Sequence, residues 1–546
     1  MKRMVALVSA CLFVMTCTAL DKGEKNKDEK AREEKPSQVS DVFYVASAPP
    51  PPASRPAEQF VATNGVEGGV VGGYALGTAS FKMADREPPQ PQYSAAPERD
   101  FIEAAKETTT TFAIDVDRAS YTNVRRFLSA NAVPPPEAVR IEEMLNYFSY
   151  SYPQPTGQHP FSITTEVASC PWNVNNRLLR IGIQGRNLEE WRMAANNLVF
   201  LIDVSGSMQP PNRLPLLKSA FRLLVDKLRA EDRVAIVVYA GAAGLVLPPT
   251  SGADKETIIA ALDRLNAGGS TAGAAGIELA YQTAKDNFIT DGNNRVILAT
   301  DGDFNVGVTS QDELLKMIEE KRNSGIYLTT VGVGDDNYHD ARMEMLADKG
   351  NGNYSYLDNV KEAQKVFQHE LTGTLVTIAK DVKVQLEFNP ALVKSYRQIG
   401  YENRALANED FDDDTKDAGE LGAGHSVTAL YEIVPNGAAR GEIATLRLRY
   451  KQPSGTNSEL ITAAARDAGR NIHEASSDLQ FAAAIAEFGM LLKDSKFKGT
   501  STYADALALA RAARGIDLDG TREEVLRMLE TSRTLKGESP VAVAGQ

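Results

Sequence analysis

The stretch Leu198-Val-Phe-Leu-Ile-Asp203-Val-Ser-Gly-Ser207 decides the fold of this 546-residue chain, because an apolar run ends abruptly in oxygen-bearing side chains. A second apolar run, Val296-Ile-Leu-Ala-Thr-Asp301-Gly302, ends in the same way, and Gly268-Gly-Ser-Thr271 lies between the two. Short apolar runs alternating with helical patterns indicate a parallel sheet, whose ligand-binding groups gather at the carboxyl ends of the strands. The candidate ligands for a hard divalent cation are therefore Asp203, Ser205, Ser207, Thr271 and Asp301.

The alternation of strand and helix extends over residues 196–372. Strands are expected at 197–203, 233–240, 295–301 and 326–333. Helices are expected at 213–229, 254–265, 273–288, 311–323, 340–348 and 360–372. The pattern predicts a Rossmann-like α/β domain with a mostly parallel sheet and helices on both faces.

The segments on either side of this domain have a different pattern. Period-two alternation predicts strands at 161–184 and again at 378–450, whereas the pattern from residue 476 onward is helical. We expect the two groups of strands to pair into one β-sandwich, into which the α/β domain is inserted. The predicted parts are an N-terminal flanking α/β region, the α/β domain, a β-rich region and a helical region, at 108–195, 196–372, 373–460 and 461–540.

The N-terminal part of the chain has the features of an export signal followed by a tether. Residues 1–17 carry Lys2 and Arg3 before an apolar stretch that is too short to span a bilayer, and Cys17 closes a lipobox-like sequence. Cys11 is an alternative lipid site. A further alternative is that the signal is cleaved without lipid attachment or is kept. Residues 18–107 are charged and then rich in Pro, Ala and Gly, so we expect a disordered tether. These features predict a lipid-anchored protein of the bacterial cell envelope.

Charge and cysteine content exclude some classes of protein. The net charge of -13 argues against nucleic-acid binding. Beyond Cys17 the chain has one cysteine, Cys170, so no intramolecular disulfide can form in the mature protein. We expect Cys170 to be a small buried apolar residue.

The candidate ligands suit an ion that keeps an open position. Serine and threonine hydroxyls are neutral, so only two carboxylates, Asp203 and Asp301, offset the charge of the cation. Mg²⁺ favours octahedral coordination and normally retains several waters, one of which a carboxylate from another molecule can replace. The alternative is that the side chains of Asp-x-Ser-x-Ser only stabilise a turn and cap the helix that follows. The occurrence of all three segments in order, each at a strand end, favours the metal site.

Residues 196–372 resemble a von Willebrand factor A (VWA) domain. Asp203, Ser205 and Ser207 match its Asp-x-Ser-x-Ser metal-ion-dependent adhesion motif, and Thr271 and Asp301 match its threonine and aspartate. The resemblance implies bound Mg²⁺, with Mn²⁺ or Ca²⁺ as alternatives, and recognition of a protein partner that offers Asp or Glu. The flanks, through segments such as Phe112-Ala-Ile-Asp-Val-Asp-Arg-Ala-Ser-Tyr121 and Leu479-Gln-Phe-Ala482, are similar to bacterial YfbK-like proteins.

These observations favour a non-enzymatic binding protein. A hydrolase that uses the same metal to activate water is an alternative, but it needs a general base that the sequence does not supply near the motif. A scaffold whose metal only stabilises the fold is the third candidate. Asp115-Val-Asp117 resembles the Asp-x-Asp motif of some phosphatases. Here it is better explained as a turn at the end of a strand.

Four other features of the sequence are candidate sites. The acidic run at 409–414 lacks the spacing of a calcium loop and favours a solvated loop. Asp303 either lies near the metal without binding it directly or belongs to a turn. The apolar stripe of Phe481, Ile485, Phe488 and Leu492 favours a core helix over a partner surface. The histidines show no zinc spacing.

Overall fold

A computed structural model describes most of the chain beyond the N-terminal segment. The described residues are 93, 97–114, 117–188, 193–269, 273–302, 311–335, 340–370, 375–416, 418–437 and 440–538. The predictions for Cys11, Cys17, Asp115, Thr271 and Asp303 fall on residues outside these ranges. None of the helices in the described ranges combines the length and the apolar character needed to cross a bilayer.

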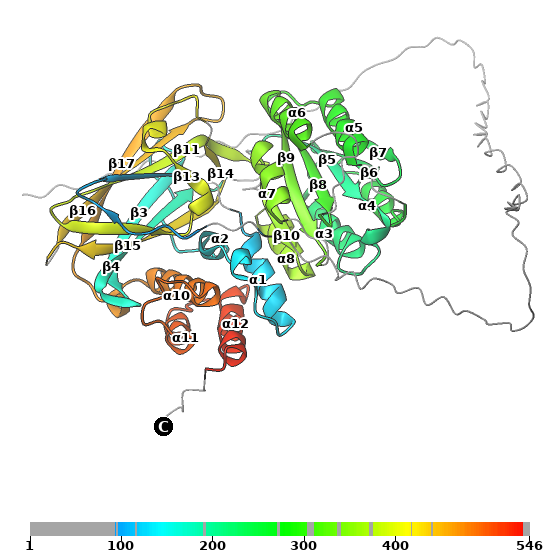
Figure 1. Cartoon of the computed structure of the whole chain (residues 1–546). Coiled ribbons are helices and arrows are strands. Elements are labelled where there is room, and N and C mark those ends of the chain that lie inside the picture. Colours follow the sequence, from blue (N-terminus) through cyan, green and yellow to red (C-terminus); the bar gives the residue numbers. More distant parts are fainter. Residues whose placement is uncertain are drawn as a thin grey trace, which may run out of the picture. The chain divides into compact units, whose positions relative to one another are not determined.

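A six-stranded sheet forms the centre of the α/β domain (Figure 1). Its strand order is β10-β9-β8-β5-β6-β7, and every pair is parallel except β6 with β7. The strands are β5 (Asn196–Asp203), β6 (Arg233–Tyr239), β7 (Ala243–Ser251), β8 (Asn293–Thr300), β9 (Ile326–Val333) and β10 (Tyr354–Leu357). The four predicted strands are present, and the two edge strands, β7 and β10, were not predicted.

Helices cover both faces of this sheet, as predicted. Alternate residues of β5 belong to different cores: Phe200 lies in the core with α3 and α4, whereas Leu201 lies in the core with α5 and α6. The helices are α3 (Leu214–Lys227), α4 (Lys255–Asp263), α5 (Gly273–Asp286), α6 (Gln311–Asn323), α7 (Asp340–Lys349) and α8 (Val360–Gln364), which continues as a π-helix (Lys365–His369). Because strand side chains alternate in direction, one apolar strand contributes to both cores.

The flanking strands form two further sheets, with orders β1-β12-β15-β4-β3 and β13-β2-β11-β16-β17, and β14 pairs with β11. The strands before the α/β domain are β1 (Ile102–Glu103), β2 (Thr109–Ala113), β3 (Phe161–Cys170) and β4 (Asn173–Gly185). Those after it are β11 (Thr377–Phe388), β12 (Val393–Ile399), β13 (Ala405–Leu406), β14 (Gly419–Gly422), β15 (Ser426–Pro435), β16 (Gly441–Lys451) and β17 (Ser458–Asp467).

Strands from before and after the α/β domain are direct neighbours in both flanking sheets. In one sheet β4 pairs with β15 (Ile183 opposite Val427), and in the other β2 pairs with β11 (Phe112 opposite Val384). Side chains of both sheets share one apolar core. The prediction of a single β-sandwich that carries the α/β domain as an insertion is therefore confirmed.

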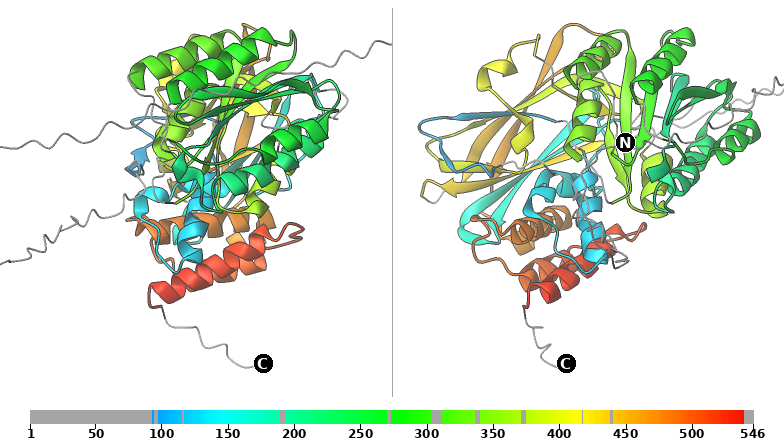
Figure 2. Two further views of the ribbon diagram at one scale, coloured as in Figure 1. Left: turned by 90° about the vertical axis from the view of Figure 1, so that its right-hand side faces the viewer. Right: turned by 45° about the vertical axis from the view of Figure 1, so that its right-hand side comes forward.

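A helical group packs against the sandwich and the α/β domain, as Figure 2 shows. It contains α1 (Ala119–Ser129), a 3-10 turn (Pro136–Ala138), α2 (Ile141–Asn146), α10 (Ser477–Lys493), α11 (Tyr503–Ala512) and α12 (Thr521–Leu535). The predicted stripe on α10 lies in the core of this group, so its core assignment is confirmed. Cys170 is buried in the same core, and burial raises the pKa of its thiol well above the usual range.

Two segments differ from the sequence-based prediction. The expected tether, 18–107, overlaps β1, in which Ile102 pairs with Tyr396, and Glu98 accepts a hydrogen bond from Ser495. The expected helical region, 461–540, begins within β17, which ends at Asp467. Both strands lie at sheet edges. β1 pairs with β12, which is distant in sequence, whereas β17 pairs with β16, the strand directly before it.

The acidic run lies beside the sandwich. Arg449 of β16 pairs with Asp412 and Asp414, and Lys383 of β11 donates to the backbone carbonyls of Asp410 and Asp413. The charges of this run are therefore partly offset by basic side chains of the adjacent sheet.

Candidate metal centre at the ends of β5 and β8

The two predicted carboxylates lie at one edge of the central sheet. Strands β5 and β8 are parallel neighbours, with Ile202 opposite Ala299. Asp203 is the last residue of β5, and Asp301 directly follows the last residue of β8. Asp203 is 0% exposed and Asp301 is 1% exposed. The parallel register thus brings together residues that are almost a hundred positions apart.

Both carboxylate oxygens of Asp203 are held in place. Oδ1 accepts the backbone N–H of Ser205 at 2.8 Å, and Oδ2 accepts the hydroxyl of Thr300 at 3.1 Å. Burial raises the pKa of Asp203 to about 6, and the negative charge of Asp301 acts in the same direction, whereas the hydrogen bonds oppose it. A buried carboxylate of this kind is stabilised by a nearby cation.

The two predicted serines lie next to each other on the loop after β5. The Ser205 and Ser207 Oγ atoms are 3.0 Å apart, and a 3-10 turn spans Gly206–Met208. The loop is tied to the segment before Thr271, because Gly206 N–H bonds to the Gly269 carbonyl at 3.1 Å and Gly268 N–H to the Val204 carbonyl at 2.7 Å. Gly269 has φ +91°, a conformation that favours glycine. These bonds hold the glycine pair against the loop that carries the two serines.

Arg213 is part of this site and was not predicted. Its Nη1 donates to Asp301 Oδ2 at 2.7 Å and to the Ser207 carbonyl at 2.8 Å, and the residue is 5% exposed. Gly334, at φ +81°, makes room for it, since a Cβ there would lie 2.6 Å from Arg213 Nε. The sequence Pro211-Asn-Arg213-Leu carries no signal of this role, because an arginine before a helix is usually exposed.

The chemistry of these donors fits a hard divalent cation. Adjacent ligands of an octahedral ion with bonds of about 2.1 Å lie about 3 Å apart, which agrees with the 3.0 Å between the serine hydroxyls. The candidate metal ligands that the structure describes here all offer oxygen atoms, and only two of them are carboxylates. No cluster of three His, Cys, Asp or Glu side chains suited to a metal occurs in the described ranges. Asp203, Ser205 and Ser207 are the described residues best placed to hold the ion, and Arg213 offsets the charge of Asp301.

Tyr239 is a titratable group next to Asp203. Burial raises the pKa of Tyr239 well above its usual range, and the neighbouring Asp203 charge raises it further, so its phenol stays protonated. Of the histidines with described surroundings, His159 contacts Tyr450 in the sandwich, His425 follows β14, and His473 lies in the 3-10 turn before α10.

Comparison with known proteins agrees with this architecture. The family model for the von Willebrand factor type A domain matches residues 197–369, and one described as von Willebrand factor matches 87–180. The model for the C-terminal part of the uncharacterized protein YfbK matches 373–441 and 436–535. The fold and these matches define a VWA-domain protein, a class that mediates protein–protein interaction and adhesion.

Relatives with matching sequences extend over most of the chain. The uncharacterized protein YfbK of Escherichia coli K12 is 42% identical over 480 residues, which span 83% of this chain and 81% of that protein. The chain therefore belongs to the YfbK family of VWA-domain proteins. The uncharacterized protein sll0103 of Synechocystis is 26% identical, over 53% of this chain and 69% of its own. Among solved structures, the von Willebrand factor type A protein from Catenulispora acidiphila has a TM-score of 0.40 at 17% identity, over 70% of this chain and 92% of its own.

Proposed function

We propose that this protein is a non-enzymatic binding protein of the bacterial cell envelope. Its VWA domain holds Mg²⁺ (or Mn²⁺ or Ca²⁺) through Asp203, Ser205, Ser207, Thr271 and Asp301, and the ion captures an acidic side chain of a partner protein. The observation that carries the proposal is the donor set at the ends of β5 and β8, which is rich in hydroxyls and poor in carboxylates.

Two features of the site support this capture: the fixed position of the Asp203 carboxylate and the positive charge of Arg213. The bonds from Ser205 N–H and Thr300 fix the Asp203 carboxylate before any ligand arrives, which lowers the cost of ordering the site. Arg213 bonds to Asp301, so the site presents less negative charge than two free carboxylates. A cation in such a site keeps its attraction for an outside carboxylate, and a charge-assisted contact of that kind anchors a protein partner.

The location at the envelope rests on the N-terminal sequence. Lipid on Cys17 would anchor the chain, and the Pro- and Gly-rich segment that follows would separate the folded part from the membrane surface. The partner is then another protein of the same compartment.

Two linked measurements test the proposal. Calorimetric titration with Mg²⁺ compares the wild type with Asp203→Ala and with a control, Asp226→Ala, which removes an exposed carboxylate of α3. We expect the first variant to lose Mg²⁺ binding and the control to retain it. Envelope proteins are then captured on the immobilised wild type with Mg²⁺ and with EDTA, and a specific partner should be released by EDTA and rebind when Mg²⁺ is restored.

Three results would contradict the proposal. Equal Mg²⁺ binding by the wild type and Asp203→Ala would remove the assigned site. Partner capture that ignores EDTA would remove the role of the metal. Phosphatase or protease turnover that disappears in Asp203→Ala would replace the binding function with the hydrolase alternative.

A further inference from the structure

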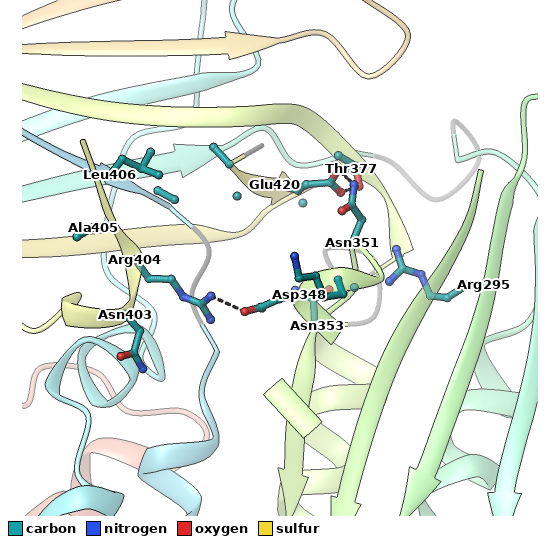
Figure 3. Close-up of a pocket in the computed structure, with 16 residues that line it drawn as sticks. Arg295, Asp348, Asn351, Asn353, Thr377, Asn403, Arg404, Ala405, Leu406 and Glu420 are labelled. Carbon is teal, nitrogen blue, oxygen red and sulfur yellow. Dashed lines mark hydrogen bonds and ion pairs between the residues drawn. The ribbon is translucent and has the colours of Figure 1, made fainter. Parts of the chain in front are cut away.

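A polar cavity lies between the VWA domain and the β-sandwich, apart from the candidate metal centre. Its volume is about 330 Å³, and it is lined from the VWA side by Arg295, Asn351 and Asn353 and from the sandwich side by Thr377 and Glu420 (Figure 3). A cavity of this size is at the small end of the range for small-molecule sites. Because Arg295 is near the start of β8, the cavity is at the opposite end of that strand from Asp301.

Arg295 is a buried cation that faces this cavity. It is 1% exposed, and its Nη1 donates to the Thr329 hydroxyl at 2.7 Å. Its Nε has no hydrogen-bond partner among the described residues, and no described carboxylate comes within 4 Å of the guanidinium. Figure 3 shows its side chain extending from β8 towards Asn351. A buried guanidinium normally has an anion in contact, because removing the charge from water is costly.

The two acidic residues that line the cavity, Glu420 and Asp348, are bonded to other residues. Glu420 Oε1 accepts from Asn351 at 2.8 Å, and its Oε2 accepts from Thr377 at 3.2 Å. Asp348 Oδ2 pairs with Arg404 at 2.6 Å. Burial lowers the pKa of Arg295 to about 10, and the charge of Glu420 opposes this only in part. Glu420 is thus near enough to influence Arg295 without contacting it.

We propose that this cavity binds a small oxyanion, with Arg295 as its main cationic ligand. Asn351, Asn353 and Thr377 are the neutral polar groups at hand, and arginine recognises phosphate and carboxylate groups through its planar array of donors. The ligand is either an inorganic oxyanion or the carboxylate of a small acid. Since both domains line the cavity, the bound anion would link the VWA domain to the sandwich. This inference is independent of the proposed metal site.

The inference is tested by titrating the full chain with inorganic phosphate and, in a parallel arm, with glutarate. Sodium chloride keeps the ionic strength constant in both arms. Calorimetry and the thermal unfolding midpoint are recorded for the wild type, Arg295→Met, Glu420→Gln and the control Arg466→Met, which removes an exposed arginine of β17. The arm with the tighter saturable binding identifies the ligand class. We expect Arg295→Met to bind at least tenfold more weakly than the wild type and Arg466→Met to bind like it.

Glu420→Gln gives a test that does not depend on losing the buried arginine. If an external anion is the ligand of Arg295, removing the nearby negative charge should tighten its binding about tenfold. If Glu420 is itself the counter-ion of Arg295, the same variant should lower the unfolding midpoint and leave anion binding no tighter. That second outcome, or an absence of saturable binding of both anions to the wild type, would overturn the inference.

Discussion

Replacing Arg213 with methionine removes the positive charge from the candidate metal centre while keeping a long apolar side chain. In the wild type this guanidinium bonds to Asp301 at 2.7 Å and to the Ser207 carbonyl at 2.8 Å. Without a cation, the variant leaves Asp301 buried and without this partner, which should cost about 3–5 kcal/mol of stability. With a cation bound, the released carboxylate becomes available to the ion.

The gain in metal affinity follows from electrostatics. Removing a unit positive charge at roughly 6 Å from a divalent ion changes its binding free energy by about 5 kcal/mol at an effective dielectric constant of about 20. Water at an open site screens this interaction, so we expect a Mg²⁺ dissociation constant that is about 10- to 100-fold lower. At saturating Mg²⁺, each tenfold gain in affinity adds about 1.4 kcal/mol to the free energy of unfolding.

Calorimetry and thermal unfolding with and without Mg²⁺ measure both effects. Arg213→Lys keeps a positive charge and should lie closer to the wild type. Arg222→Met is the matched control, because Arg222 is a partly exposed arginine of α3, the helix that follows Arg213, and it pairs with Asp263. Mg²⁺ affinity in Arg213→Met that is unchanged, or that shifts equally in Arg222→Met, would refute the reasoning. Failure of all four proteins to bind Mg²⁺ would instead contradict the metal site itself.

Three further predictions concern the helical group and the contact between the sandwich and α7. Burial raises the pKa of Glu487 to about 7 from an unfolded value near 4.5, so the native state binds the proton more tightly. The free energy of unfolding should therefore fall by up to about 3 kcal/mol as pH rises from about 4.5 to 7. Urea unfolding across this range should show a smaller fall in Glu487→Gln. Phe481→Ala, which empties a core position against Phe148, should cost about 3–5 kcal/mol by urea unfolding, and a loss below about 1 kcal/mol would contradict the packing. Arg404→Met removes the partner of buried acidic groups between the sandwich and α7 and should cost about 3–5 kcal/mol by the same assay, whereas Arg466→Met should be nearly neutral.

The central sheet was predictable because its strands are continuous apolar runs. Buried parallel strands need apolar side chains on both faces, and this requirement is visible locally in segments such as 197–203 and 326–333. The edge strands β7 and β10 were missed because a strand with one free side tolerates prolines and polar residues, as Pro248 in β7 illustrates. Period-two alternation likewise identified the sandwich strands at 161–184 and 378–450, but β1 and β17 lie outside these ranges. The position of the VWA domain between the two groups suggested the pairing that the structure confirms.

By itself, the sequence determined that Asp203 and Asp301 follow apolar strands and that Ser205 and Ser207 accompany the first of them, because strand ends and short motifs are local properties of the chain. Only the tertiary structure decided which charged groups meet them. Arg213 reaches Asp301 through the fold, Gly334 allows that approach, and Arg295 becomes buried against a cavity that two domains share. An arginine in a sequence carries no sign of its burial, since the free energy of burying its charge depends on partners that folding brings from distant parts of the chain.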